Sequence, residues 1–513
     1  MGQTALMLMF VTILSKVFGF LRESVMAYFY GAGDIVAIYA VANTLPVVIA
    51  NFVASGIIFG FIPIYTKAKN EEGEEVAEEF TSNIFNILMV FGFISVTLGF
   101  IFAGTFCKLF SPDLKGELLH TAIVFTRIIM FAIFAYLYSA VFRGYLNLKG
   151  NFFIPAITGL IMNGIIIAFT IFSGLAKNPY LLAIGCLLGN VLQYIMFPKA
   201  NREHGYRHIN KIDIHNKYIK SLILIAVPVI ISSAAGEIAL TVDNSMASYF
   251  FGNASISYLR YSKTLLSLIT GVITVSVTTS IFPTISHLGQ SGKIEDMKNH
   301  INSAIVSTMF LVIPSTIGMM ALSVPIIKLV YQRGAFDDKS VIITAAMLIA
   351  YAPFVIFQSF SDVIDKGFYA VGDSKSPVII VVIQQIINVI LNFILIKFFD
   401  IEGLALATTI SAGLGALMML VKFRKNFGRI NFKTSLKSLI KITVLSIFMG
   451  LIAWGIYESL STKISYLLAM FIAIIVAGLF YAITILFARI PEVMNMINHI
   501  YHKLKKERII LNK

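Results

Sequence analysis

Long apolar runs follow one another along nearly the whole chain and are separated by short polar connections. An α-helix needs about 20 apolar residues to cross a bilayer. The alternating ten-residue strands of an outer-membrane barrel are absent. The pattern therefore predicts an all-α polytopic membrane protein with about 14 transmembrane helices. The predicted spans are about 5–30, 33–66, 80–107, 118–146, 152–174, 178–199, 219–250, 256–288, 300–327, 340–370, 376–398, 402–423, 435–457 and 464–489.

The chain also carries a weak internal repeat. Three pairs of segments share an offset of about 220 residues, which is typical of transporters that alternate access around a site between two halves. The pairs are YFYGAGDIVAIYAV (28–41) with YFFGNASISYLRYS (249–262), GFIPIYTK (60–67) with SIFPTISH (280–287), and FRGYLNLKGNFFIP (142–155) with DKGFYAVGDSKSP (365–377). We therefore expect two pseudo-symmetric six-helix lobes, at 1–217 and 218–425, followed by two extra helices and a basic tail at 426–513.

Composition agrees with a bilayer as the solvent, because 58% of the residues are hydrophobic and only 13% are charged. The net charge of +14 lies in short connections, which indicates topology rather than nucleic-acid binding. Connections after even-numbered spans carry most of the Lys and Arg, so both termini are expected in the cytoplasm. Cys107 and Cys186 lie within or beside apolar runs and are expected to be buried thiols. The acidic run 70–79 is expected to be a solvated cytoplasmic surface.

Charged residues inside the spans are the candidates for function. An Arg at a helix centre costs about 2.5–3.5 kcal/mol on insertion scales and normally faces a wet cavity or a partner. The candidates are Lys16, Arg22, Glu23, Arg127, Arg143, Glu237, Asp243, Arg260, Lys263, Asp362, Asp365 and Lys366. Arg143, Asp365 and Lys366 lie near predicted cytoplasmic ends, where snorkelling to the interface is an equal alternative. Arg22 is deep in its span and is the principal candidate.

Arg22 and Glu23 are adjacent and therefore about 100° apart on a helix. We do not expect them to neutralise each other within the helix. The excess of cations in the first half favours an anionic, phosphate-bearing substrate, since guanidinium groups bind phosphate oxygens bidentately. A drug or cation exporter would instead need carboxylates, and only Glu23 qualifies there.

Enzyme signatures are missing from the sequence. It contains no P-loop, and His204, His208 and His215 in a basic connection are interpreted as surface residues. A membrane-embedded transferase would need a cluster of His or Asp outside the bilayer, which the sequence does not offer. We expect a non-enzyme that uses no nucleotide directly.

Four motifs resemble the MurJ (MviN) lipid II flippases, a branch of the multidrug/oligosaccharidyl-lipid/polysaccharide exporter superfamily. They are SKVFGFLRESVMAYFYGAG (15–33), VYQRGAF (330–336), GFYAVGDSKSPV (367–378) and NVILNFILIKFFDIEGLALATTIS (388–411). The resemblance implies fourteen helices, two six-helix lobes and two extra helices beside a lipid groove. It implies translocation of undecaprenyl-diphosphate-linked peptidoglycan precursor from the inner to the outer leaflet of the bacterial cytoplasmic membrane. Membrane lipids surround the protein, and other cell-wall synthesis proteins are candidate partners.

The resemblance also assigns site residues. The arginine of the first-helix motif falls on Arg22, and a second cavity cation falls on Lys263 or, with a one-turn slip, on Arg260. Lys16, Glu23 and Arg127 complete the expected substrate-binding set. A sodium site, the only cofactor that the resemblance implies, would use Asp243, Asn388, Asn392 and Thr408. For the two asparagines, hydrogen bonding between helices is an equal alternative.

Other positions depart from the family pattern. An arginine pair and a glutamate are expected after the LP of the second helix, but Ala50, Asn51 and Ser55 occupy those places, and Ala37 stands where an aspartate is expected. The sequence therefore predicts either a divergent lipid II flippase or a flippase for another polyprenyl-diphosphate-linked oligosaccharide.

Overall fold

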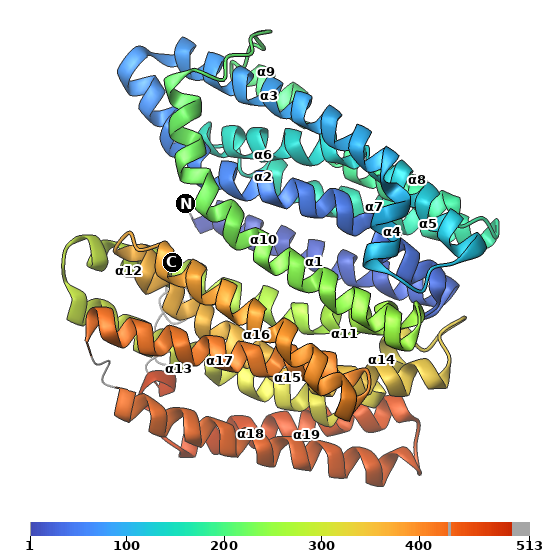
Figure 1. The fold of residues 1–513 in the computed structure, drawn as a ribbon. Coiled ribbons are helices and arrows are strands. Elements are labelled where there is room, and N and C mark those ends of the chain that lie inside the picture. Colours follow the sequence, from blue (N-terminus) through green and yellow to red (C-terminus); the bar gives the residue numbers. More distant parts are fainter. Residues whose placement is uncertain (1, 429–431, 495–513) are drawn as a thin grey trace, which may run out of the picture. The chain divides into compact units, whose positions relative to one another are not determined.

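The computed structural model describes residues 2–428 and 432–494. This part of the chain is helical throughout and contains no β-strand. The elements are α1 (Gly2–Tyr30), α2 (Asp34–Glu72), α3 (Glu74–Ile101), α4 (Ala103–Phe110), α5 (Gly116–Ile129), α6 (Ala132–Leu148), α7 (Phe153–Leu175), α8 (Tyr180–Leu192), α9 (Phe197–Glu203), α10 (Lys217–Phe251), α11 (Ala254–Ile269), the π-helical turn η1 (Thr270–Thr274), α12 (Val275–Gln290), α13 (Ile294–Ala321), α14 (Ser323–Tyr331), α15 (Asp338–Ala370), α16 (Lys375–Phe399), α17 (Glu402–Phe427), α18 (Phe432–Ser461) and α19 (Tyr466–Phe487) (Figure 1).

Twelve segments of the described chain are long and apolar enough to cross a membrane. Each matches one of the spans expected from the sequence. The two remaining expected spans, 5–30 and 219–250, correspond to α1 and α10, which are 29 and 35 residues long. The all-helical polytopic class is confirmed, and the count of about 14 spans stays a prediction.

The described chain divides into two compact units. The N-terminal unit comprises the described residues within Met1–Tyr261 and Tyr331–Ser340, and the C-terminal unit comprises those within Ser262–Val330 and Val341–Lys513. This division follows packing, whereas the lobes at 1–217, 218–425 and 426–513 follow the sequence repeat. The lobe boundaries therefore stay a prediction.

In the N-terminal unit, α2 lies at the centre and packs against α10, α6, α3 and α5, while α1 packs along α7. Small residues allow the close approach of α2 and α10, because a Cβ at Gly56 would lie 2.5 Å from the Ala226 Cβ. The core between these helices is rich in aromatic rings, among them Phe61 stacked on Phe80 and Tyr65 edge-on to Tyr145. α7 also packs against α8, so α1 joins this group of helices mainly through α7.

In the C-terminal unit, α16 pairs with α17, α13 with α18, and α18 with α19 (Figure 1). Its core includes Ile301, Ile305, Phe368 and Phe423, which are almost fully buried. Many large apolar side chains of α18 and α19 are exposed on the opposite faces, as expected for helices whose solvent is lipid.

The internal repeat is visible in local structure. In its first pair, the turn between α1 and α2 and the turn between α10 and α11 each contain a glycine with positive φ, Gly31 and Gly252. In its third pair, the turns between α6 and α7 and between α15 and α16 use Gly150 and Gly372 in the same way. Because only glycine adopts this conformation without strain, equivalent turns kept the same residue type at the same offset.

The sequence predicts a solvated surface for the acidic run 70–79, but the structure shows that part of the run is buried. Glu78 is buried and accepts hydrogen bonds from Tyr65 and Tyr145. Two other carboxylates of the run pair with lysines in the connection before α10 and at its first residue: Glu79 with Lys211, and Glu72 with Lys217. The hydrogen bonds from Lys217 and Tyr218 lower the pKa of the Glu72 carboxyl. The run therefore links the junction of α2 and α3 to the connection between α9 and α10.

Candidate functional site

Glu23 is the centre of a charged cluster inside the N-terminal unit. It lies on α1 and is 1% exposed. Arg260, on α11, donates from Nε to Oε2 at 2.9 Å and from Nη2 to Oε1 at 2.7 Å, so the guanidinium holds the carboxylate bidentately. Arg22 approaches the same Oε1 with Nη2 at 2.7 Å. One buried carboxylate is thus shared by two cations from helices far apart in sequence.

The ion pair between Arg22 and Glu23 shows that one expectation from the sequence was wrong. The Cβ atoms of adjacent residues do point about 100° apart. The long arginine side chain nevertheless turns back, so that Nε also reaches Glu23 Oε1, at 3.2 Å. Helical spacing therefore underestimated how far a guanidinium can reach.

Asn163, on α7, fixes the other side of Arg22. Its Oδ1 accepts from Arg22 Nη1 at 3.1 Å, while its Nδ2 donates to the Gly159 carbonyl at 2.8 Å. The backbone bond fixes the orientation of the amide so that its oxygen faces the guanidinium. Sequence reasoning missed this residue, although a lone buried amide in the apolar run IMNGIIIA was a usable signal.

Aromatic rings surround the second arginine. The Arg260 guanidinium lies over the Tyr39 ring, 5.0 Å from its centroid. Tyr261, next in the chain, is fully buried and packs against Tyr331 with the ring centroids 4.7 Å apart. Since these walls keep the local dielectric low, charges in the cluster act more strongly than they would in water.

The electrostatic balance of the cluster favours an anion. Two guanidinium groups and one carboxylate leave a net charge of +1. The side chains of Arg22 and Arg260 are 19% and 20% exposed, whereas that of Glu23 is 1% exposed. An approaching ligand therefore meets the two cations and not the carboxylate, and phosphate oxygens suit such a pair of forked donors.

A segment from late in the sequence packs beside this cluster. Within the N-terminal unit, Ala335 N donates to the Tyr28 carbonyl at 2.9 Å, and Tyr261 Oη donates to the Gly31 carbonyl at 2.9 Å. A Cβ at Gly334 would lie 2.1 Å from the Tyr28 oxygen. Residues 331–336 of the motif VYQRGAF thus pack against the end of α1, a few residues beyond Arg22 and Glu23.

The other expected substrate-binding residues lie elsewhere. Lys16 is exposed on α1. The Arg127 guanidinium lies over the Phe100 ring of α3, 4.5 Å from its centroid, and Nε donates to the Phe100 carbonyl. Lys263 belongs to the C-terminal unit, where its Nζ lies 5.0 Å from the Tyr351 ring centroid. Of the two alternatives for the second cation, the structure brings Arg260 to Glu23.

The expected sodium ligands divide between the units. Asp243 is buried on α10 of the N-terminal unit. In the C-terminal unit, Asn388 and Asn392 are buried on α16, and Asn388 Nδ2 donates to Thr408 Oγ1 of α17 at 3.1 Å. This hydrogen bond between α16 and α17 is the helix-to-helix contact that the sequence predicts as the alternative to a sodium site. It leaves the buried Asn388 Oδ1 without a hydrogen-bond partner among the described residues, so the oxygen is a suitable donor for a hard cation.

No group of three or more His, Cys, Asp or Glu side chains in the described ranges could hold a metal ion. Both cysteines are buried free thiols, as expected. The site thus consists of guanidinium, carboxylate, amide and aromatic groups.

The polytopic helical bundle and the arginine cluster with a net charge of +1 are together typical of a membrane transporter. The family model "Lipid II flippase MurJ" matches residues 26–477, so the chain belongs to this family. It is 26% identical to the probable lipid II flippase MurJ of Buchnera aphidicola subsp. Baizongia pistaciae over 458 residues, which covers 86% of each chain. It is 26% identical to the probable MurJ of Synechocystis sp. over 526 residues, which covers 96% of each.

Solved structures give the same result. The fold matches a lipid II flippase MurJ in an inward closed conformation with a TM-score of 0.79 and 26% identity, covering 93% of this chain and 98% of that one. It also matches an inward-facing multidrug resistance MATE family transporter of the MOP superfamily, with a TM-score of 0.68, 13% identity, and coverage of 80% and 94%. At that identity, the second match supports the fold alone.

Proposed function

We propose that this protein is a lipid II flippase that moves the undecaprenyl-diphosphate-linked peptidoglycan precursor from the inner to the outer leaflet of the bacterial cytoplasmic membrane. The observation that carries the proposal is the pair of guanidinium groups around Glu23. A diphosphate presents several oxygens in the geometry that arginine donors recognise bidentately. Membership of the MurJ family supports the same substrate.

In this mechanism, Arg22 and Arg260 engage the diphosphate and Glu23 positions both cations. Glu23 holds the two like charges together before the substrate arrives, which reduces the reorganisation needed on binding. Alternating access then exposes the site to the other side of the membrane. The process is transport without chemical catalysis.

The driving force in this proposal is the membrane potential or an ion gradient. One elementary charge is worth about 2.3 kcal/mol per 100 mV, which is enough to bias such a cycle. Sodium is the candidate coupling ion. Sodium would be bound by the neutral side-chain oxygens of Asn388, Asn392 and Thr408. Asp243 is included only because of the family resemblance.

In the same proposal both termini lie in the cytoplasm, and other cell-wall synthesis proteins are candidate partners.

A second substrate class has an observation in its favour. Ala50 and Asn51 stand where the family pattern has arginines, so the N-terminal unit carries fewer cations than that pattern predicts. A flippase for another polyprenyl-diphosphate-linked oligosaccharide would keep the diphosphate site and differ in the glycan. The family match favours lipid II.

Complementation tests the proposal. Cells depleted of their own lipid II flippase are expected to grow when they express this chain, and not when they express Arg22→Ala at the same level. Growth with Arg22→Ala would contradict the role of Arg22. Failure of the wild-type chain here, with rescue of a strain that lacks another lipid-linked glycan flippase, would establish the second class instead.

A further inference from the structure

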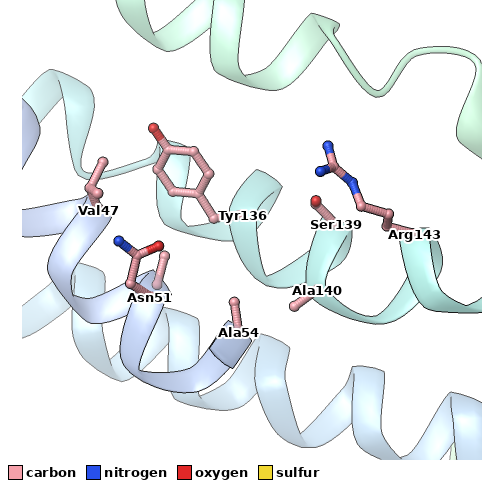
Figure 2. A pocket seen from close by; sticks show the side chains of 8 residues that line it. Val47, Asn51, Ala54, Tyr136, Ser139, Ala140 and Arg143 are labelled. Atoms are coloured by element: carbon pink, nitrogen blue, oxygen red, sulfur yellow. The ribbon is translucent and has the colours of Figure 1, made fainter. Parts of the chain in front are cut away.

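A small pocket opens between α2 and α6 of the N-terminal unit, and its lining includes none of the residues that bond Glu23. It has a volume of about 140 Å³ and is lined by Val47, Ala50, Asn51, Ala54, Tyr136, Ser139, Ala140 and Arg143. Figure 2 shows the polar ends of Tyr136, Ser139 and Arg143 pointing to the same side, away from Ala54 and Ala140. The pocket thus has small apolar residues on one side and the polar ends of Tyr136, Ser139 and Arg143 on another.

Arg143 is the only charged residue in this lining. Its Nη2 donates to Thr158 Oγ1 on α7 at 3.1 Å. Its Nε is buried and has no hydrogen-bond partner among the described residues. A buried, unsatisfied donor on a charged group is costly. A side chain that merely snorkelled would carry its guanidinium into water, where every donor is satisfied.

The opposite wall of the pocket, on α2, has no charged side chain. Ala50 and Asn51 line the pocket from α2. Asn51 Nδ2 donates to Glu237 Oε1 at 2.8 Å. Across the pocket, α6 supplies the guanidinium that α2 lacks.

Arg143 and Arg22 both donate hydrogen bonds to side chains of α7. Arg143 bonds Thr158 and Arg22 bonds Asn163, five residues further along the same helix. At a rise of about 1.5 Å per residue, the two contacts lie about 7–8 Å apart along the α7 axis. Five residues also turn by about 140° around the axis, so the two guanidinium groups contact α7 at different heights and on different sides.

We propose that the Arg143 pocket is a second oxyanion subsite, which binds another anionic group of the same lipid-linked head group that Arg22 and Arg260 engage. The inference rests on the proposed function. The shared chemistry is an oxyanion that accepts hydrogen bonds from the guanidinium of Arg143. Within a diphosphate-linked disaccharide-peptide, this oxyanion is either a phosphate oxygen or a peptide carboxylate.

The test measures equilibrium binding of lipid II to the purified full-length chain in lipid nanodiscs. Arg143→Gln is expected to weaken binding about tenfold or more, as loss of a charge-assisted hydrogen bond predicts. Lys199→Gln, which removes an equal charge from a side chain that is 85% exposed, is expected to bind like the wild type. The double variant Asn51→Arg/Arg143→Gln is expected to recover most of the affinity, because it returns a guanidinium from the facing wall.

Two further ligands identify the anionic group. If undecaprenyl diphosphate loses as much affinity as lipid II on Arg143→Gln, the subsite binds phosphate. If only lipid II with free peptide carboxylates loses affinity, and its amidated form does not, the subsite binds a carboxylate. Arg143→Lys, which keeps the charge but loses the forked donors, is expected to lie between wild type and Arg143→Gln.

The outcomes separate this inference from the proposed function. If Arg143→Gln binds lipid II like the wild type while Arg22→Gln does not, the subsite is refuted and the proposed function stands. If the wild-type chain does not prefer lipid II to other lipids, both are refuted. Each variant must have a melting temperature close to that of the wild type. If Arg143→Gln does not fold, Arg143→Lys replaces it in the binding measurement, and wild-type affinity of Arg143→Lys would then refute the subsite.

Discussion

Glu23 and Arg260 lie 237 positions apart in the sequence and form a two-point ion pair, with Nε–Oε2 and Nη2–Oε1 distances of 2.9 and 2.7 Å. The carboxylate is fully buried, and Arg22 bonds it as well. Glu23 therefore holds together two cations that would otherwise repel each other. It determines where the positive charge of the site lies.

The first prediction concerns this ion pair. Glu23→Ala leaves two arginines without their shared counter-charge and should be destabilising by about 3–5 kcal/mol, whereas Arg260→Ala leaves Glu23 paired with Arg22 and should cost less. The double variant should lose less than the sum, with a coupling free energy of about 1–3 kcal/mol. Thermal unfolding of the detergent-purified variants measures this. Additive losses would show that the two residues do not interact.

The second prediction concerns Asn163, whose amide oxygen accepts from Arg22. Asn163→Asp adds a carboxylate beside Arg22 and brings the net charge of the cluster to zero, whereas Asn163→Ala leaves the charge at +1. Asn163→Asp should therefore reduce lipid II binding more than Asn163→Ala, by about tenfold. The order is expected to hold at equal protein level and equal melting temperature. The reverse order would show that Asn163 acts only by packing.

The third prediction concerns Gly334, where φ is +58° and a Cβ would lie 2.1 Å from the Tyr28 carbonyl oxygen. Gly334→Ala should lose about 1–3 kcal/mol of stability and weaken the contact between residues 331–340 and α1. Gly116→Ala is the matched control, because its φ is +53° and a Cβ there meets nothing within 4 Å. Equal losses of melting temperature in both variants would assign the effect to backbone strain alone.

Much of the fold could be predicted from the sequence, because apolar length and glycine turns are local properties. Gly31, Gly150, Gly252 and Gly372 end equivalent helices, and their common offset is readable without coordinates. The packing of residues 331–340 within the N-terminal unit could not be predicted, since it depends on a backbone contact between segments about 300 positions apart.

The candidate site was predictable only in part. The cost of charge in lipid identifies Arg22, Glu23 and Arg260 one by one. Their mutual geometry depends on side-chain reach and on which helices meet, and neither can be read from spacing. For the same reason the sequence missed Asn163, whose role comes from a partner 141 positions away.

The central claim is that Arg22 and Arg260 bind the diphosphate of a lipid that the protein moves across the membrane. The most direct test is translocation of fluorescent lipid II in proteoliposomes that contain only the purified protein and an imposed membrane potential or sodium gradient. We predict rapid movement with the wild type and with Lys199→Gln, and at least tenfold slower movement with Arg22→Gln and Arg260→Gln. Translocation by Arg22→Gln and Arg260→Gln at the wild-type rate would contradict the claim.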